Sequence, residues 1–270
     1  MPSSTRALSL QQWLHQLLLA CGGQPGEDSG YRLRWARPQT GPAYIYDLNP
    51  ALPLAQRFAL ANNLISRWQS LELPATPPLL LQIKTHTQLH PLPSGQLTLT
   101  PDAIALAAWL TWFRHSQGLS PWPVRPAPDL VLAPTSLAAR LQLSPWMAIH
   151  YIQSRCHHLA RLMDTKAAQP ESKLPPTPLE DRGEDLKDLV PRTKAGQRVL
   201  GGIVHLVDGL VDVRVEGEGT RFKLAYNLAT EVDSWLSQIT LTTPPPELTL
   251  LLKGVDYSLS LVTGRPGQQL

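Results

Sequence analysis

The segment 145–163 holds the residues whose types and spacing suit chemistry best, and its apolar positions recur with the period of an amphipathic helix. Histidine, tyrosine and arginine side chains stack on unpaired bases and form hydrogen bonds with them. The segment therefore predicts a surface that binds single-stranded RNA. A solvated helix face without a ligand is the alternative interpretation. The candidate RNA-binding residues of this helix are His150, Tyr151, Arg155, His157 and Arg161.

The same helix contains four side chains of types that bind metal ions, those of His150, Cys156, His157 and His158. His150 and His157 share a helix face two turns apart, but neither has a further ligand-type residue four positions later. Cys156 falls on the apolar stripe together with Ile149. The segment therefore predicts no metal site, and we expect no cofactor.

A second group of basic residues lies near the N-terminus, where Arg32 and Arg34 alternate with Leu33 and Trp35. This alternation places the two arginines on one side of a strand and the apolar pair on the other, core-facing side. A sheet face that carries arginines binds phosphates without reading a sequence, while exposed arginines of no function are the alternative. Lys84 is expected on a neighbouring strand. The candidates in this group are Arg32, Arg34, Arg37 and Lys84.

Charge is distributed unevenly over the 270 residues of the chain. Residues 1–163 contain about 12 Lys and Arg against about 6 Asp and Glu, whereas residues 164–270 contain about 12 against about 15. The basic residues of the first part are nearly all arginine, which suits bidentate contacts with phosphate. A base-composition bias of the genome would explain the same excess. Hydrophobic residues make up 43% of the chain, which excludes a wholly disordered protein.

Two cysteines, Cys21 and Cys156, are too few for a disulfide framework, which indicates a reducing compartment such as the cytoplasm. The sequence LLAC at 18–21 resembles a lipoprotein cleavage site. However, Gln11 and His15 interrupt the apolar region that a signal peptide requires, and their spacing predicts an amphipathic helix instead. No stretch of about 18 apolar residues occurs, so we expect no membrane span.

The first part of the chain, 1–118, predicts a small α/β domain. Its three expected helices begin at cap or proline signals, which are Ser9 with Gln12, Asn49-Pro50 and Thr100-Pro101-Asp102. Its four expected strands are 31–36, 43–48, 79–85 and 94–100. The order of these elements indicates an antiparallel or mixed sheet that packs with three helices.

The second part of the chain predicts a helical bundle at 143–270. The proline-rich segment 119–142 has the composition of an extended linker, and the polar segment at about 165–195 has that of a solvated insert. Apolar residues recur with the helical period in four segments, which are 145–163, 196–212, 222–239 and 247–262. The two parts together place the chain in the α+β class.

The segment IHYIQSRCHHLAR at 149–161 resembles the opening helix of the DALR anticodon-binding domain of arginyl-tRNA synthetases, whose motif reads Val-Gln-Tyr-Ala-His-Ala-Arg-x-x-Ser-Ile-x-Arg. His150 stands in place of the motif's Gln, and Gln153 stands in place of its His. Two later segments, 223–236 and 251–270, are similar to a later helix and the closing helix of that domain. The resemblance implies a DALR-like fold for 143–270 and contact with an anticodon. The matching residues are Ile149, Tyr151, Arg155, Leu159 and Arg161.

The segment SGQLTLTPDAIALAAWL at 94–110 resembles a strand and helix of the N-terminal additional domain of the same synthetases. In that family the additional domain meets the tRNA elbow and the DALR domain meets the anticodon. The catalytic domain between them is missing here, because neither His-Ile-Gly-His nor Lys-Met-Ser-Lys-Ser occurs and 119–142 is too short to hold it. The sequence also lacks a Walker loop, a Rossmann glycine pattern and a Gly-x-Ser-x-Gly motif. We therefore expect a protein that is not an enzyme.

The resemblance implies a non-catalytic tRNA-binding protein, for example an adaptor that presents an arginine tRNA to a modifying or charging enzyme. A split synthetase that works beside a separate catalytic chain differs from this only in its partner. The rival hypothesis is a protein-interaction or assembly factor that kept the synthetase-like fold and lost RNA binding. Eight tryptophans, among them Trp122 and Trp146 beside prolines, suit such a protein surface.

Overall fold

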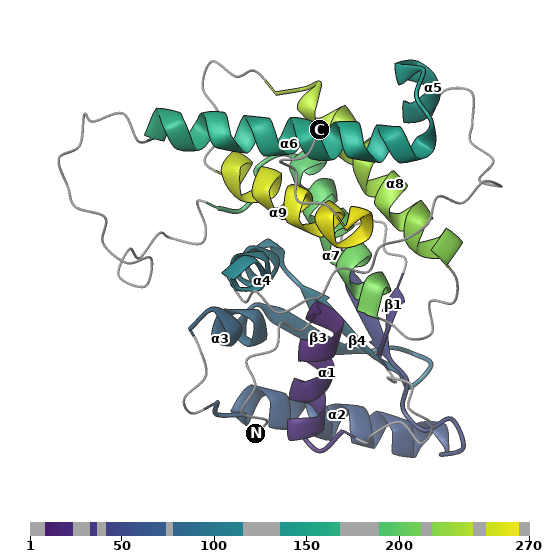
Figure 1. Cartoon of the computed structure of the whole chain (residues 1–270). Coiled ribbons are helices and arrows are strands. Elements are labelled where there is room, and N and C mark those ends of the chain that lie inside the picture. Colours follow the sequence, from purple (N-terminus) through teal and green to yellow (C-terminus); the bar gives the residue numbers. More distant parts are fainter. Residues whose placement is uncertain are drawn as a thin grey trace. The chain divides into compact units, whose positions relative to one another are not determined.

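The computed structural model of the chain describes residues 9–23, 33–36, 42–73, 78–115, 136–167, 189–211, 218–239 and 247–264 (Figure 1). The chain divides into two units. Met1–Leu119 and Val204–Glu216 form the first unit, and Ser120–Ile203 and Gly217–Leu270 form the second. The described residues contain helices and one small antiparallel sheet, which confirms the α+β class. The sequence pattern assigned 204–211 to the bundle, whereas these residues belong to the first unit.

The sheet belongs to the first unit and has the strand order β1-β2-β4-β3, in which every neighbouring pair is antiparallel. Its strands are β1 (Leu33–Ala36), β2 (Ala43–Tyr46), β3 (Thr87–Pro91) and β4 (Leu97–Pro101). A tight turn joins β3 to β4, where Gly95 has φ +76° and donates its N–H to the carbonyl of Leu92. A positive φ favours glycine, so this turn depends on Gly95.

One face of the sheet lies in the core of the first unit. Side chains alternate along each strand, and the register places Leu33 opposite Tyr46 and Tyr46 opposite Leu97. These three residues are fully buried, and Tyr44 and Leu99 continue the same buried face. The alternating burial along β2 and β4 confirms the strands predicted at 43–48 and 94–100.

In the described part of the first unit, the sheet is accompanied by α1 (Leu10–Ala20), α2 (Leu54–Ser70), α3 (Pro78–Thr85), α4 (Ala103–His115) and the second half of α7 (Lys194–Val211). The predicted capping box is present at the start of α1. The hydroxyl of Ser9 accepts from the N–H of Gln12, and the Gln12 side chain accepts from the N–H of Ser9. α1 ends before Gly22, whose φ of +88° favours glycine.

The segment 79–85 is part of a helix, so the prediction of a strand there is wrong. α3 begins at Pro78, where the missing N–H of proline costs nothing because the first turn has no partner for it. Leucine is also a strong helix former, and a short apolar run has too few residues to distinguish a buried strand from a helix. The third strand follows α3 directly, and the hydroxyl of Thr87 donates to the carbonyl of the buried Ile83.

Two helices of the first unit begin later than their sequence signals. Asn49 forms a turn through its own side chain, and α2 begins only at Leu54. Asp102, not Thr100, caps α4, because its Oδ1 accepts hydrogen bonds from two backbone N–H groups of the first turn. The cap is therefore the last polar residue before the apolar stretch of the helix.

In the described part of the second unit, the helices are α5 (Leu137–Leu141), α6 (Pro145–Ala167), the first half of α7, α8 (Glu218–Leu236) and α9 (Glu247–Thr263). The last four confirm the helices predicted from apolar periodicity, with small shifts at their ends. α5 was not predicted, because it lies within the segment expected to be a linker. Ser136 caps the start of α5, and Gln142 follows its last residue with φ +55°. Ser136 was the sequence signal that could have predicted this helix.

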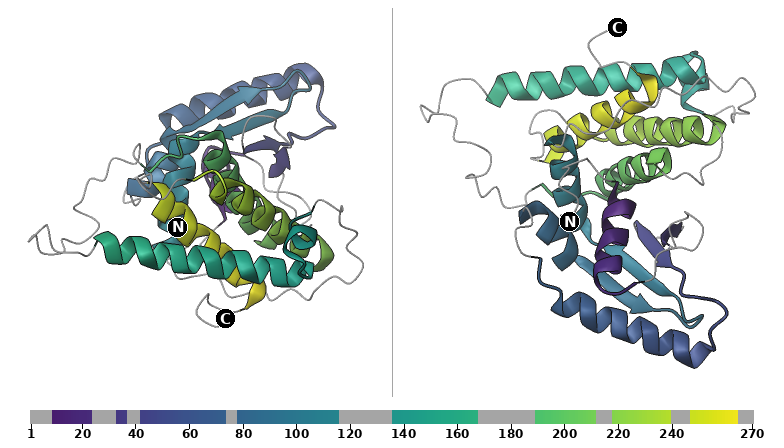
Figure 2. Two further views of the ribbon diagram at one scale, coloured as in Figure 1. Left: turned by 90° about the horizontal axis from the view of Figure 1, so that it is seen from above. Right: turned by 60° about the horizontal axis from the view of Figure 1, so that its bottom comes forward.

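α6 lies across α8 and α9 (Figures 1 and 2). Its residues Ile149, Ile152 and Cys156 are fully buried, which confirms the predicted apolar stripe. Val232 of α8 and Val255 of α9 are fully buried as well. Because α6 packs against two helices at once, this packing decides which of its polar side chains reach solvent.

Candidate functional site

His150 is buried, with 5% of its surface exposed, so it does not lie on the predicted RNA-binding surface of α6. Its ring meets the ring of Trp146 edge to face, with 4.9 Å between the ring centroids. Trp146 in turn stacks on Phe222 of α8, with 5.9 Å between centroids. Because α6 contacts both α8 and α9, the buried side of α6 extends beyond its apolar stripe. His150 lies on this additional buried part of the helix.

His157 is held inside the second unit by an acidic residue of α9. Its Nδ1 lies 2.9 Å from Oδ2 of Asp256, and 15% of its side chain is exposed. Nε2 of Gln153 lies 3.5 Å from the other carboxylate oxygen of Asp256, and the hydroxyl of Thr263 donates to Oε1 of Gln153. This network joins α6 to α9 and leaves little of His157 accessible to an RNA base.

Arg155 belongs to a cluster of charged residues from three helices. Its Nη1 lies 3.3 Å from Oδ1 of Asp233 in α8, and Nη2 of Arg140 in α5 donates to Oδ2 of the same carboxylate. The side chain of Asp233 is 12% exposed, whereas those of Arg140 and Arg155 are 55% and 37% exposed. Sequence reasoning missed Arg140, because a basic residue in a proline-rich segment follows no helical period there.

Tyr151, His158 and Arg161 face solvent on α6, and we call these three residues the α6 outer face. Tyr151 is 42% exposed. Nδ1 of His158 lies 2.7 Å from the carbonyl oxygen of Ser154. Because a carbonyl only accepts hydrogen bonds, Nδ1 carries a proton, and Nε2 is the ring nitrogen left for a ligand. The α6 outer face thus offers a phenol ring, an imidazole and a guanidinium.

The two basic candidates of the first unit that the structure describes do not lie on one sheet face. Arg34 is exposed on β1, as predicted, but its Nε lies 3.1 Å from Oδ2 of Asp47. Lys84 lies in α3 rather than on a neighbouring strand, and its Nζ donates to the carbonyl of Leu71 at 2.8 Å. The remaining two candidates of this group lie outside the described residues, and they are Arg32 and Arg37.

A buried carboxylate that no sequence motif indicates lies in the first unit. Asp208, in the half of α7 that belongs to this unit, is 4% exposed. The hydroxyl of Tyr44 donates to its Oδ2 at 2.6 Å, and the N–H of Gln11 donates to its Oδ1 at 3.0 Å. Burial, and then the charge of Asp208, raise the pKa of Tyr44 well above its usual value. Tyr44 therefore stays protonated at neutral pH and acts as a donor.

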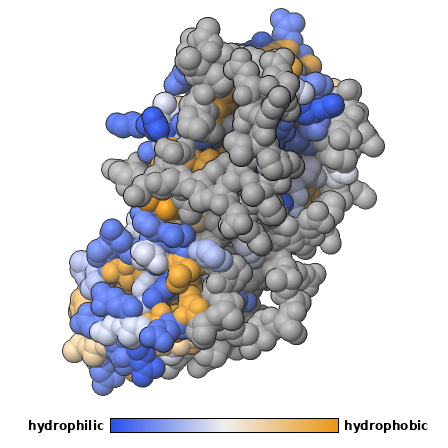
Figure 3. Space-filling model, turned by 90° about the vertical axis from the view of Figure 1, so that its left-hand side faces the viewer, coloured by the Kyte–Doolittle hydropathy of each residue, from blue (hydrophilic) through white to orange (hydrophobic). Residues whose placement is uncertain are grey.

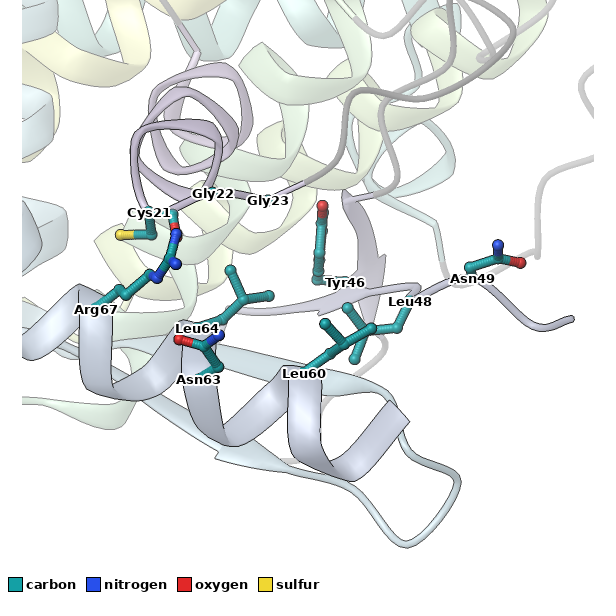
Figure 4. A pocket seen from close by; sticks show the side chains of 10 residues that line it. All are labelled: Cys21, Gly22, Gly23, Tyr46, Leu48, Asn49, Leu60, Asn63, Leu64 and Arg67. Atoms are coloured by element: carbon teal, nitrogen blue, oxygen red, sulfur yellow. The ribbon is translucent and has the colours of Figure 1, made fainter. Parts of the chain in front are cut away.

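A cavity of about 230 Å³ in the first unit lies between the end of α1, β2 and α2 (Figure 4). Arg67 of α2 points toward the end of α1, and its Nη1 lies 3.5 Å from the carbonyl oxygen of Cys21. Burial raises the pKa of the Cys21 thiol, although the positive charges of Lys84 and Arg67 oppose the shift. The cavity is therefore lined by a protonated thiol and by a guanidinium that contacts the helix end, so Cys21 is not an activated nucleophile.

Among the residues that the structure describes, no group of three or more His, Cys, Asp and Glu side chains is placed to bind a metal ion. Cys156 is fully buried, and burial followed by the charge of Asp256 raises the pKa of its thiol. None of the described helices is both long enough and apolar enough to cross a membrane.

The chain matches no protein-family model, no curated protein and no solved structure. Its function is therefore inferred from the chemistry of its own side chains. The α6 outer face and the arginines beside it bring a phenol ring, an imidazole and guanidinium groups to partly or fully exposed positions of the second unit.

Proposed function

We propose that this chain is a non-catalytic tRNA-binding protein that binds single-stranded RNA on the α6 outer face. The supporting observation is Tyr151, which is 42% exposed on a helix whose His150 and His157 are engaged inside the unit. Residues 145–163 contain no Asp or Glu, so no carboxylate of this segment repels a phosphate. The similarity of this helix to the opening helix of a DALR domain fits an adaptor that presents an arginine tRNA to a modifying or charging enzyme.

Each residue of the α6 outer face has a distinct role in the proposed contact. Tyr151 is a platform on which an unpaired base stacks, an interaction of about 1–3 kcal/mol. His158 forms a hydrogen bond through Nε2 with a ribose 2′-hydroxyl, which can donate or accept. Arg161 donates to a phosphate, which positions the strand without reading its sequence.

Replacement of Tyr151 tests the proposal. We expect Tyr151→Ala to weaken binding to an arginine tRNA and to its isolated anticodon stem-loop about tenfold, because one stacked base is lost. Tyr151→Phe is the matched control, since it keeps the ring and should keep the affinity. Fluorescence anisotropy at low and moderate salt measures both variants. Equal affinities of Tyr151→Ala and the wild type, or a wild type that does not bind tRNA at low salt, would contradict the proposal.

Exposed leucines of the first unit favour a second function, that of a protein-interaction or assembly factor. Leu54 and Leu60 of α2 are 46% and 38% exposed, and Leu81 of α3 is 43% exposed. Apolar side chains lie among polar ones on the face shown in Figure 3. The tryptophans add no support, because none in the described ranges is exposed. Ultraviolet absorbance of the purified protein distinguishes the two functions, since it shows whether nucleic acid co-purifies.

A further inference from the structure

Arg140 and Arg155, which we call the arginine fork, are held in place by contacts to α8. Both guanidiniums bind the carboxylate of Asp233, one at each oxygen. α5, which carries Arg140, has a second anchor, because the hydroxyl of Tyr226 in α8 accepts from the N–H of Ala138 at 2.8 Å. The side chain of Asp233 is only 12% exposed, so the carboxylate is fixed by packing and orients both arginines.

The charges of this cluster do not cancel. One carboxylate faces two guanidiniums, and neither arginine has a second acidic partner among the described residues. A guanidinium has five N–H donors, of which the bonds to Asp233 use few. The arginine side chains are 55% and 37% exposed, so their remaining donors reach solvent. The fork thus carries a residual positive charge and unused donors in a fixed geometry, which is what a phosphate requires.

We propose that the arginine fork is a phosphate-binding site, and that it holds a backbone phosphate of the RNA whose base stacks on Tyr151. Tyr151 lies one helical turn before Arg155 on the same side of α6, so a base on the ring has its backbone near the fork. This inference rests on the proposed function and deepens it. It assigns a binding role to Arg140 of α5 and a positioning role to Asp233.

Arg140→Gln tests the fork directly, because this side chain is largely exposed and its loss leaves the core intact. We expect the affinity for an arginine tRNA transcript to fall roughly tenfold. The slope of log affinity against log salt should fall by about one, since one phosphate contact is lost. Lys223→Gln is the matched control, because it removes one exposed charge of α8 in the same unit and should leave the affinity nearly unchanged. Thermal unfolding followed by circular dichroism checks the fold, and both variants should unfold at the wild-type temperature.

Asp233→Asn separates positioning from net charge. Removal of a negative charge by itself strengthens binding to a polyanion. If Asp233 holds the fork, the variant instead binds tRNA several-fold more weakly than the wild type, because the two guanidiniums lose their common anchor. Asp164→Asn makes the same change of charge at an exposed carboxylate that pairs with Lys253, and it should bind as well as the wild type or better.

The outcomes distinguish the fork from the proposed function. A wild type that binds tRNA while Arg140→Gln keeps the same affinity and salt slope would overturn the phosphate site and leave RNA binding on α6 in place. Equal strengthening by Asp233→Asn and Asp164→Asn would overturn the positioning role of Asp233. A wild type without affinity for tRNA would overturn both the site and the function on which it rests.

Discussion

Asp208 brings a carboxylate into the core of the first unit, where the hydroxyl of Tyr44 and the N–H of Gln11 bind it. Burial of a carboxylate without hydrogen-bond donors costs several kcal/mol of folding free energy. These two hydrogen bonds offset that cost and stabilise Asp208 in the core. One turn earlier, His205 stacks on Trp35 of β1, with 4.5 Å between ring centroids. Through these side chains the second half of α7 contacts α1, β1 and β2.

Tyr44→Phe should lower the free energy of unfolding by about 1–3 kcal/mol, because it removes a donor from Asp208 and keeps the buried ring. Denaturant unfolding followed by circular dichroism measures the change. Tyr151→Phe is the control, since its hydroxyl lies on an exposed side chain and its loss should cost less than about 0.5 kcal/mol. Equal stabilities of the two variants would show that Asp208 does not depend on Tyr44.

Asp102 connects elements as well as capping one. Its Oδ1 accepts from the first turn of α4, and its Oδ2 lies 2.9 Å from Nδ1 of His86, between α3 and β3. Its own N–H donates to the carbonyl of His86. A single side chain at the end of β4 thus fixes where α4 starts and joins that point to the neighbouring strand.

Asp102→Ala should destabilise the first unit by about 1–2 kcal/mol, because the N-terminal N–H groups of α4 lose their acceptor. Asp102→Asn keeps an acceptor oxygen and should recover most of the loss. Asp164→Ala is an external control, because its ion pair with Lys253 is exposed and contributes less than about 1 kcal/mol. Thermal unfolding measured for the three variants checks the order. If Asp102→Asn lost as much stability as Asp102→Ala, the negative charge of Asp102, rather than its capping hydrogen bonds, would explain the destabilisation.

The second unit, taken as a whole, is assembled from segments on both sides of residues 168–188. α6 precedes this segment, and α8 and α9, on which α6 packs, follow it. The contacts from Arg155 to Asp233 and from His157 to Asp256 also join the two sides. The unit is therefore expected to hold together without a continuous chain through 168–188.

Limited trypsin digestion tests this assembly. The polar, proline-rich composition of 168–188, with Lys173, Arg182 and Lys187, predicts cleavage there first. We expect the two fragments to elute together at the position of the intact protein on a sizing column, because separation would expose the apolar stripe of α6. Denaturing electrophoresis of the same fractions shows that the chain was cut. Fragments that elute separately under native conditions would place the domain boundary near residue 180 instead.

Elements whose signals are local could be predicted from the amino-acid sequence. The capping box of Ser9 and Gln12 joins residues three positions apart, and the stripe that includes Leu251 and Val255 follows the helical period over one segment. Such patterns depend on hydrogen bonds and helix faces formed by residues close together in the sequence. They can therefore be recognised before the fold is known. The segment 79–85 is the exception, because a run of this length fits a strand or a helix equally well. The DALR-like fold remains a prediction.

Which polar side chains remain available for a ligand depends on contacts between residues far apart in the chain. Arg155 contacts a residue 78 positions away, and Arg140 one 93 positions away. The hydroxyl of Tyr44 binds a carboxylate 164 positions away. Periodicity places a residue on a face of its own helix or strand, but it does not state which element will cover that face. The burial of His150 and the grouping of Arg140 with Arg155 follow from how α5, α6, α8 and α9 pack together, because burial and ion pairing depend on neighbours in space rather than in sequence.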